Sequence, residues 1–277
     1  MTLYLQTYGS GWALVVLPSF GLDQAATADV MEPVFADLAG WRRLYLDLPG
    51  TGASPPGVPR SDAVADEVVA TIGAELGDEP FAILGWSYGA YLAAGVTRRV
   101  PRQISGLMMV CAGFKIRPED RDLTGVAAPS PESRWLTGAP PALHEHLTHA
   151  VGRQTAEIAE RIAVNLARNS PSDEAYLVTL RGEGFTLSDE GAPTPCDAPV
   201  CFLTGHRDRV VGFANLVDAL DSYEHASYTI LASAGHYLPL EHPAPFASVT
   251  QSWLAQCEEF LDAGSDRTRA TPSPRSP

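Results

Sequence analysis

The first half of the chain alternates short apolar runs with helical patterns, and this alternation limits the possible folds more than any other feature. The runs are strongly apolar, which suits parallel strands that are covered on both faces. The sequence therefore predicts an α/β fold with a mostly parallel central sheet flanked by helices. Strands are expected at residues 3–7, 13–18, 43–48, 81–86, 104–112, 199–204 and 227–231.

Helical patterns separate these runs. In residues 26–39, Val30, Val34 and Leu38 lie four apart on one helix face. Ser61 is expected to cap the helix that ends near Leu76, because a serine hydroxyl can accept a free N–H of the first turn. Further helices are expected at 88–98 and 213–220, and a final helix is expected to begin near residue 243.

Residues 114–192 interrupt the alternation with helical stretches near 141–153, 155–167 and 172–180 and no strong strand. An all-helical block inside an alternating α/β chain is typical of a cap. We therefore expect an α/β core at 1–113 and 193–262 and a helical cap at 114–192. Residues 263–277 are rich in Ser, Thr, Pro and Arg, and a disordered tail is expected there.

Charge and composition narrow the class of function. The 277 residues carry 33 acidic and 19 basic side chains, a formal net charge of −14. This balance argues against binding to nucleic acid or to anionic membranes, both of which require basic patches. The N-terminal residues lack the pattern of a signal peptide, and no run of about 18 apolar residues could span a membrane. A cytoplasmic enzyme with a small-molecule substrate is expected.

The segment Gly85-Trp86-Ser87-Tyr88-Gly89 matches the pattern G-x-S-x-G at the point where a buried strand gives way to a helix. A serine at so tight a turn exposes its hydroxyl, and the flanking glycines allow the strand and the helix to approach closely. The helix N-terminus also favours negative charge that develops beside it. Ser87 is the candidate nucleophile; the alternative is a glycine-rich turn without a chemical role.

A serine nucleophile needs a base, and His236 is the best placed histidine. It lies on the loop that follows the last expected strand, so it should reach the same end of the sheet as Ser87. His242 is the nearest rival, but its position at the start of the final helix favours capping or packing.

The base in turn needs an acid that fixes its tautomer. Asp208 follows the strand at 199–204, and the chain order Ser, Asp, His agrees with this role. The alternative for a single aspartate is a solvated turn residue. If Asp208 were not the acid, a carboxylate after the strand at 104–112 would be the next candidate.

These motifs together resemble the α/β-hydrolase family, and specifically its capped, single-domain serine hydrolases with esterase-like or thioesterase-like chemistry. The resemblance covers the chain up to about residue 262. It rests on the elbow at 85–89, the G-x-x-D of 205–208, the Gly-His pair at 235–236, the helical insertion after the family's sixth strand, and residues 47–54, which resemble the family's D-x-P-G-x-G-x-S turn after its fourth strand.

The same resemblance implies an oxyanion hole made of two backbone N–H groups. By position these belong to Tyr88, which follows the nucleophile, and to Phe20. The chain departs from the family here, because Pro18-Ser19 stands where most members carry His-Gly after their third strand. The alternative is that this loop is only structural. Trp86 and Phe20 are expected to line an apolar substrate pocket.

Two other motifs are set aside. His144-Glu145-His146-Leu147-Thr148-His149 superficially resembles a zinc motif, but H-E-x-x-H would need a histidine at 148, and no third ligand is evident. A solvated or pocket-lining face of the cap is expected instead, with no metal. Residues 47–54 hold two glycines but lack the G-K-[ST] ending of a phosphate loop, so the turn is the preferred interpretation.

The implied reaction is cofactor-free hydrolysis of an ester, thioester or related carbonyl of a small to medium-sized apolar molecule, through an acyl-enzyme on Ser87. Two alternatives from other classes remain open. One is a biosynthetic catalyst on the same fold that performs cyclisation, elimination or acyl transfer with little hydrolysis. The other is a non-catalytic ligand-binding receptor that retains the three residues.

Overall fold

The computed structural model describes residues 2–113, 115–220 and 223–269. Its main sheet has seven strands in the order β1-β3-β2-β4-β5-β8-β9. Only β1 runs antiparallel to its neighbour, so the predicted mostly parallel sheet is confirmed. The strands are β1 (Leu5–Gly9), β2 (Trp12–Leu17), β3 (Trp41–Leu46), β4 (Phe81–Trp86), β5 (Ile104–Val110), β8 (Val200–Gly205) and β9 (Ala226–Leu231).

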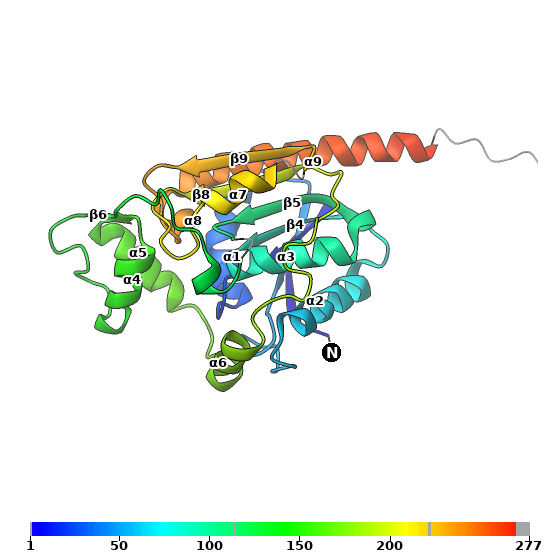
Figure 1. The fold of residues 1–277 in the computed structure, drawn as a ribbon. Helices are drawn as coiled ribbons and strands as arrows, with labels where there is room; N and C mark the ends of the chain where they lie inside the picture. The colour runs from blue at the N-terminus through cyan, green and yellow to red at the C-terminus, as the bar shows by residue number, and fades with distance from the viewer. Residues whose placement is uncertain (1, 114, 221–222, 270–277) are drawn as a thin grey trace, which may run out of the picture.

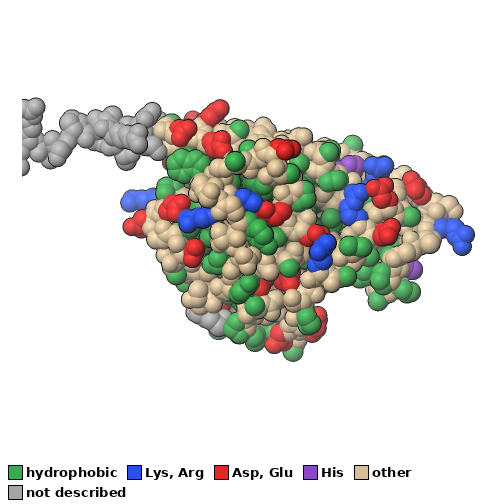
Figure 2. All heavy atoms as spheres, turned by 180° about the vertical axis from the view of Figure 1, so that it is seen from behind, with side chains coloured by type: hydrophobic (Ala, Val, Ile, Leu, Met, Phe, Trp, Pro, Cys, Tyr) green, Lys and Arg blue, Asp and Glu red, His purple; other side chains and the backbone are tan. Residues whose placement is uncertain are grey.

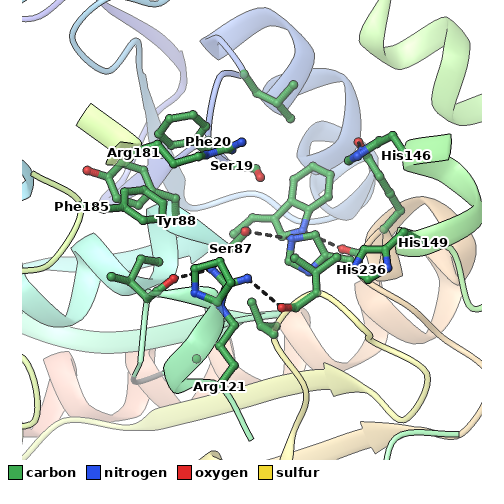
Figure 3. A pocket seen from close by; sticks show the side chains of 18 of the residues that line it. Ser19, Phe20, Ser87, Tyr88, Arg121, His146, His149, Arg181, Phe185 and His236 are labelled. Atoms are coloured by element: carbon green, nitrogen blue, oxygen red, sulfur yellow. Dashed lines mark hydrogen bonds between the residues drawn. The ribbon is translucent and has the colours of Figure 1, made fainter. Parts of the chain in front are cut away.

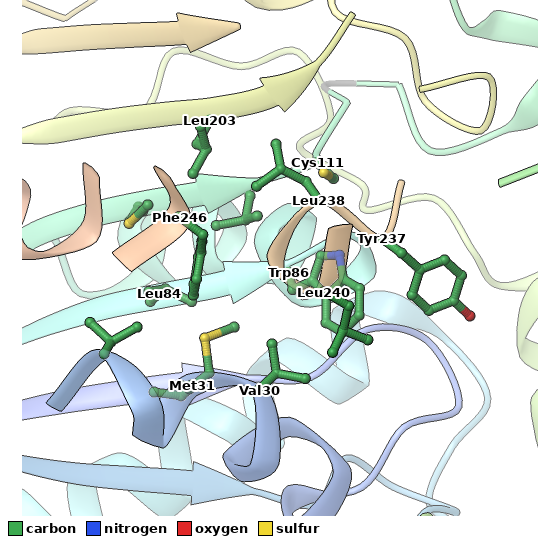
Figure 4. Packing of buried hydrophobic residues seen from close by; sticks show 14 of the residues in the cluster. Val30, Met31, Leu84, Trp86, Cys111, Leu203, Tyr237, Leu238, Leu240 and Phe246 are labelled. Carbon is green, nitrogen blue, oxygen red and sulfur yellow. The ribbon is translucent and has the colours of Figure 1, made fainter. Parts of the chain in front are cut away.

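Helices cover both faces of this sheet, which explains why its strands are apolar throughout (Figure 1). In β2, Leu14 and Val16 pack into one buried cluster, and Val15 and Leu17 pack into the other. Helices α1 (Gln24–Met31), α8 (Leu238–Glu241) and α9 (Pro243–Arg269) supply the first cluster, as Figure 4 shows around Trp86. Helices α2 (Ser61–Leu76), α3 (Tyr88–Arg99) and α7 (Ala214–Ala219) supply the second.

The chain between β5 and β8 holds α4 (His144–Ala150), α5 (Ala156–Leu166) and α6 (Glu174–Glu183). These helices lie beyond the ends toward which the parallel strands point (Figure 1). Ile158 and Ile162 of α5 join the first buried cluster, and Leu177 of α6 joins the second. The insertion is therefore packed onto the core at two places. Its description as a separate cap with boundaries at 114 and 192 stays a prediction.

Several details differ from the sequence expectations. Ser61 is not the cap of α2: Arg60 holds that position, and the Ser61 hydroxyl donates to the Phe185 carbonyl at 2.6 Å instead. The insertion also contains two short strands, β6 (Ser130–Pro131) and β7 (Arg153–Gln154). Short 3-10 helices at Glu32–Phe35, Pro101–Gln103, Pro118–Asp120 and Pro141–Leu143 complete the elements.

The ends and the surface add two observations. Helix α9 continues to Arg269, and the remainder of the expected tail, 270–277, lies outside the described residues. No helix in the described part of the chain is long and apolar enough to cross a membrane. Acidic and basic side chains are interspersed over the face shown in Figure 2 rather than gathered by sign. A cytoplasmic location stays a prediction.

Candidate active site

Ser87 occupies a sharp turn between β4 and α3. Its φ of 56° and ψ of −116° lie in a region that side chains rarely adopt, and its N–H donates to the Val110 carbonyl at 2.8 Å. A Cβ on Gly85 would lie 2.3 Å from the Ala90 nitrogen, and one on Gly89 would lie 2.4 Å from the Leu17 oxygen. Both glycines are therefore required by close packing, as the elbow pattern predicts.

The structure brings His236 to this serine. The imidazole Nε2 lies 2.9 Å from the Ser87 Oγ, although the two residues are 149 positions apart in the sequence. The loop is fixed from behind, because the Trp86 indole N–H donates to the His236 carbonyl at 3.1 Å. Its rival His242 turns away and contacts the Ser233 hydroxyl at 3.0 Å. Figure 3 shows the Ser87–His236 contact at the wall of a cavity.

Asp208 completes the chain of contacts. Its Oδ2 lies 2.9 Å from the Nδ1 of His236, and its side chain is fully buried. Its other oxygen, Oδ1, accepts the N–H groups of Val210 and Val211 at 2.9 and 3.0 Å. The two backbone donors fix the orientation of the carboxylate, with Oδ2 facing the histidine. A serine, an imidazole and a carboxylate in this geometry can transfer a proton from alcohol to base.

The two expected oxyanion donors also lie at the cavity. Phe20 and Tyr88 line it beside Ser87, and their rings meet edge to face at 5.4 Å between centroids. Within the described residues, neither backbone N–H has a hydrogen-bond acceptor. The loop is held in place by a turn in which the Leu22 N–H donates to the Ser19 carbonyl. Two free N–H groups beside a serine could stabilise an oxyanion.

The cavity has a volume of about 480 Å³. Trp86, Phe20 and Phe185 give it apolar walls, as expected for the first two. His146 and His149 of α4 also line it, so the prediction of a pocket-lining face is confirmed for this motif. His146 contacts the Tyr237 hydroxyl at 2.8 Å, and burial lowers its pKa, so its neutral form is favoured.

Residues 47–54 form the expected structural turn. The Asp47 carboxylate accepts the Gln24 N–H at 2.6 Å and the Ala53 N–H at 2.8 Å, and so joins the turn to the start of α1. A Cβ at Gly52, whose φ is +53°, would lie 2.2 Å from the same carboxylate. The glycines of this segment therefore serve the turn, and the carboxylate holds the loop that carries Phe20 to the cavity.

Glu241 joins the inserted helices to the histidine loop, a role that the sequence did not reveal. Its carboxylate is 2% exposed and accepts the N–H groups of Gly152 and Arg153 from the insertion and of Gly235 from the loop, all at 2.9–3.0 Å. The N–H of His236 itself donates to the Ala150 carbonyl at 2.7 Å. The loop that carries His236 is therefore hydrogen-bonded directly to the insertion.

Burial raises the pKa of Glu241 to about 7, against the backbone donors, which lower it. The folded protein then binds this proton more tightly than the unfolded chain does. The contribution of this carboxyl group to the free energy of unfolding is greatest below pH 4.5 and is lost as the pH rises through 7. We expect Glu241→Gln to abolish this pH dependence, worth on the order of 2 kcal/mol between pH 5.5 and 8.

Urea unfolding of both proteins at these two pH values measures the difference. Glu160→Gln, on the exposed surface of α5, is the matched control and should retain the slope of the unaltered protein. Equal slopes for the unaltered protein and the Glu241 variant would contradict the assignment.

Cys111 is another residue near the site that the sequence did not single out. It follows β5 with a φ of +47°, and its sulfur lies within 4.8 Å of ligand atoms of Asp208 and His236. Burial raises the pKa of its thiol well above the usual value, so it remains protonated. Its thiol contacts the Gly235 carbonyl at 3.7 Å, which makes it a packing residue behind the histidine loop. A cysteine thus occupies the end of β5, where the alternative carboxylate was considered.

Comparisons with known proteins agree with this geometry. A family model described as "Alpha/beta hydrolase family" matches residues 14–249. A pimeloyl-[acyl-carrier protein] methyl ester esterase from Sodalis glossinidius is 31% identical over 264 residues, covering 89% of this chain and 95% of that protein. An esterase of the same name from Aliivibrio salmonicida is 25% identical and covers 94% of this chain and 98% of its own length.

Solved structures agree in fold. An alpha/beta superfamily hydrolase from Oenococcus oeni superposes with a TM-score of 0.81 at 21% identity, covering 93% of this chain and all of that one. A thermophilic esterase from Thermogutta terrifontis gives a TM-score of 0.67 at 21% identity, covering 92% and 93% of the two chains. At these identities the likeness concerns the fold alone.

Proposed function

This chain belongs to the alpha/beta hydrolase family, and from that membership we propose that it is a serine esterase whose nucleophile is Ser87. His236 acts as general base and Asp208 orients it. One observation carries the proposal: the imidazole contacts the serine hydroxyl and the buried carboxylate at 2.9 Å each, through its two different nitrogens. In that arrangement the imidazole is placed to take a proton from the alcohol while the carboxylate stabilises the resulting imidazolium.

The acylation step begins when the ester carbonyl lies against Ser87. As its oxygen attacks the carbonyl carbon, the proton passes to Nε2 of His236, and Asp208 stabilises the imidazolium. The carbonyl oxygen becomes an oxyanion, to which the N–H groups of Phe20 and Tyr88 donate hydrogen bonds in our proposal. The ester bond then breaks, and the departing alcohol takes the proton from His236. The acyl group remains on Ser87.

Deacylation repeats these steps with water. His236 removes a proton from a water molecule that attacks the acyl-enzyme, and the same N–H groups hold the second oxyanion. The serine oxygen leaves with the proton that the histidine returns, and a carboxylic acid is released. No cofactor or metal takes part in the proposed reaction, since the balance of atoms needs only ester and water.

The relatives suggest which ester is cleaved. Both are named for a methyl ester on an acyl chain bound to a carrier protein. For this chain we propose a simple alkyl ester at the end of a short or medium acyl chain, which the apolar walls around Trp86 would accept. The alternatives of a non-hydrolytic biosynthetic catalyst and of a receptor receive no support from relatives that are named esterases.

A fluorophosphonate probe and a series of p-nitrophenyl esters test this proposal together. We expect intact-mass analysis to show one adduct, which peptide mapping places on Ser87, and hydrolysis of the acetate to octanoate esters to be blocked by that adduct. A protein that is neither labelled nor active on any of these esters would not be a serine esterase.

A further inference from the structure

The walls of the cavity carry an unusual set of charges for this chain. Acidic residues outnumber basic ones by 33 to 19 overall. Yet the described residues that line the cavity include two arginines, Arg121 and Arg181, and three histidines, and no aspartate or glutamate. Positive charge is therefore concentrated where a substrate binds, although the protein as a whole is strongly negative.

Arg181 extends from α6 over the ring of Phe20, with 4.2 Å between its guanidinium carbon and the ring centroid. In the described part of the chain its guanidinium makes neither a hydrogen bond nor an ion pair. Glu174, on the same helix, acts on it only at longer range. Partial burial lowers its pKa, which reflects the cost of holding this charge without an anionic partner. Its donors are free for a ligand.

Arg121 reaches the cavity from the segment between β5 and α4. Two of its nitrogens donate to the carbonyls of Val210 and Ile116, which fixes the guanidinium in place. Its Nε is buried and has no acceptor, and among the described residues no carboxylate forms an ion pair with it. Burial lowers its pKa, the nearby negative charge of Asp208 raises it, and the charge of Arg181 lowers it further. Arg121 thus adds to the cavity wall a positive charge that Asp208 offsets only in part.

Arg181 and Arg121 line the same cavity as Ser87. In the view of Figure 3 the Ser87 hydroxyl lies between Arg181 and Arg121. Arg181, Phe20 and Leu166 also line a second hollow of about 440 Å³, so the two hollows adjoin at Arg181. A molecule bound in the cavity at Ser87 therefore lies in the same hollow as an unpaired guanidinium.

We propose that the ester substrate carries an anionic oxygen group, a carboxylate or a phosphate, which Arg181 binds with the support of the Arg121 charge. This inference rests on the proposed esterase function and narrows its substrate class to charged esters. An arginine presents paired N–H donors that match either anion, and such charge-assisted bonds are stronger than neutral ones. The apolar walls would then hold the chain that separates the anion from the ester.

A purely structural role for Arg181 makes a different prediction. If the guanidinium only holds the Phe20 ring, and with it the proposed oxyanion donor, its loss would slow every ester alike. If it binds a substrate anion, its loss would slow only the charged ester. Arg181→Met retains a long apolar side chain over Phe20 and removes the charge, whereas Arg181→Lys retains the charge.

The first experiment compares p-nitrophenyl hydrogen adipate, which is anionic, with p-nitrophenyl hexanoate, which is neutral. We expect the unaltered protein to favour the adipate ester, and Arg181→Met to lower kcat/KM for it roughly 10- to 100-fold with less than about 3-fold change for hexanoate. Arg181→Lys should recover part of the loss. Arg168→Met, which removes a charge that pairs with Asp29 away from the cavity, is the control and should leave both rates unchanged. Equal losses on both esters, or no preference for adipate, would overturn the proposal.

The second experiment does not depend on hydrolysis. Ser87→Ala is titrated with monoethyl adipate, adipate and butyl phosphate. Binding is followed by isothermal titration calorimetry. We expect saturable binding of monoethyl adipate, with an affinity that falls at least 10-fold when Arg181→Met is added. Adipate and butyl phosphate are then compared, and the tighter binder shows whether the site prefers a carboxylate or a phosphate. If the unaltered protein hydrolyses no ester in the first experiment but Ser87→Ala still binds the anion through Arg181, only the esterase function is refuted. Anion binding that is absent, or is unaffected by Arg181→Met, would refute the role of Arg181.

Discussion

Replacing Ser87 by alanine is expected to lower kcat for ester hydrolysis by about 10⁶-fold without unfolding the protein. The effect is large because in the proposed mechanism the serine oxygen forms the covalent bond, and among the described residues no other hydroxyl is hydrogen-bonded to the imidazole 2.9 Å away. Alanine can occupy the same backbone geometry at about the same cost, since serine already bears the positive φ of 56°. The remaining rate would come from substrate binding and the free N–H groups alone.

The measurement is steady-state hydrolysis of the best ester of the p-nitrophenyl series, with circular dichroism and thermal unfolding as tests of folding. Ser248→Ala, at an exposed position of α9, is the matched control and should keep full activity. If the Ser87 variant kept more than about a hundredth of the rate, another group would be the nucleophile, and the proposed mechanism would be wrong.

Replacing Asp208 by asparagine is expected to lower kcat by about 10⁴-fold. The structure explains why so small a change is so harmful. Two backbone N–H groups, of Val210 and Val211, point at Oδ1, so the amide oxygen of asparagine must take that place. Its NH₂ group then faces Nδ1 of His236 as a donor and requires Nδ1 to be unprotonated. The proton is driven to Nε2, where the imidazole can no longer accept one from Ser87.

This prediction has its own diagnostic. Because only the tautomer of His236 is altered, the fluorophosphonate should still reach Ser87 but label it far more slowly, and the unfolding temperature should change little. Asp262→Asn, at the exposed end of α9, serves as the control. Turnover within about tenfold of the unaltered protein would mean that another group orients the base.

The reaction centre could be predicted from the sequence because its parts are local. The elbow needs only a strand, a following helix, and two glycines that lie within five residues at the turn between them. Each of these features can be recognised in the sequence. The histidine and the aspartate each follow a strand, and parallel strands end at the same edge of a sheet. The structure places Ser87, His236 and Asp208 together as expected, and the assignment of their chemical roles stays a proposal.

The remaining features could not be predicted because they depend on contacts between distant segments. Glu241 lies five residues after His236, but its carboxylate accepts the N–H groups of Gly152 and Arg153, which lie nearly ninety positions earlier. Local rules favour Ser61 as a helix cap, yet its hydroxyl donates to the carbonyl of Phe185, 124 positions away. The direction in which Arg181 points depends on how α6 packs on the core, which helical periodicity does not specify.

The hydrogen bond between the His236 N–H and the Ala150 carbonyl makes the base and the inserted helices mechanically interdependent. Lifting α4 from the core would break that bond and the Gly152 contact of Glu241, and would pull the imidazole out of alignment with Ser87. Any displacement of the insertion would therefore also separate the imidazole from the serine hydroxyl, so the position of α4 and the alignment of the proposed proton path depend on the same hydrogen bonds.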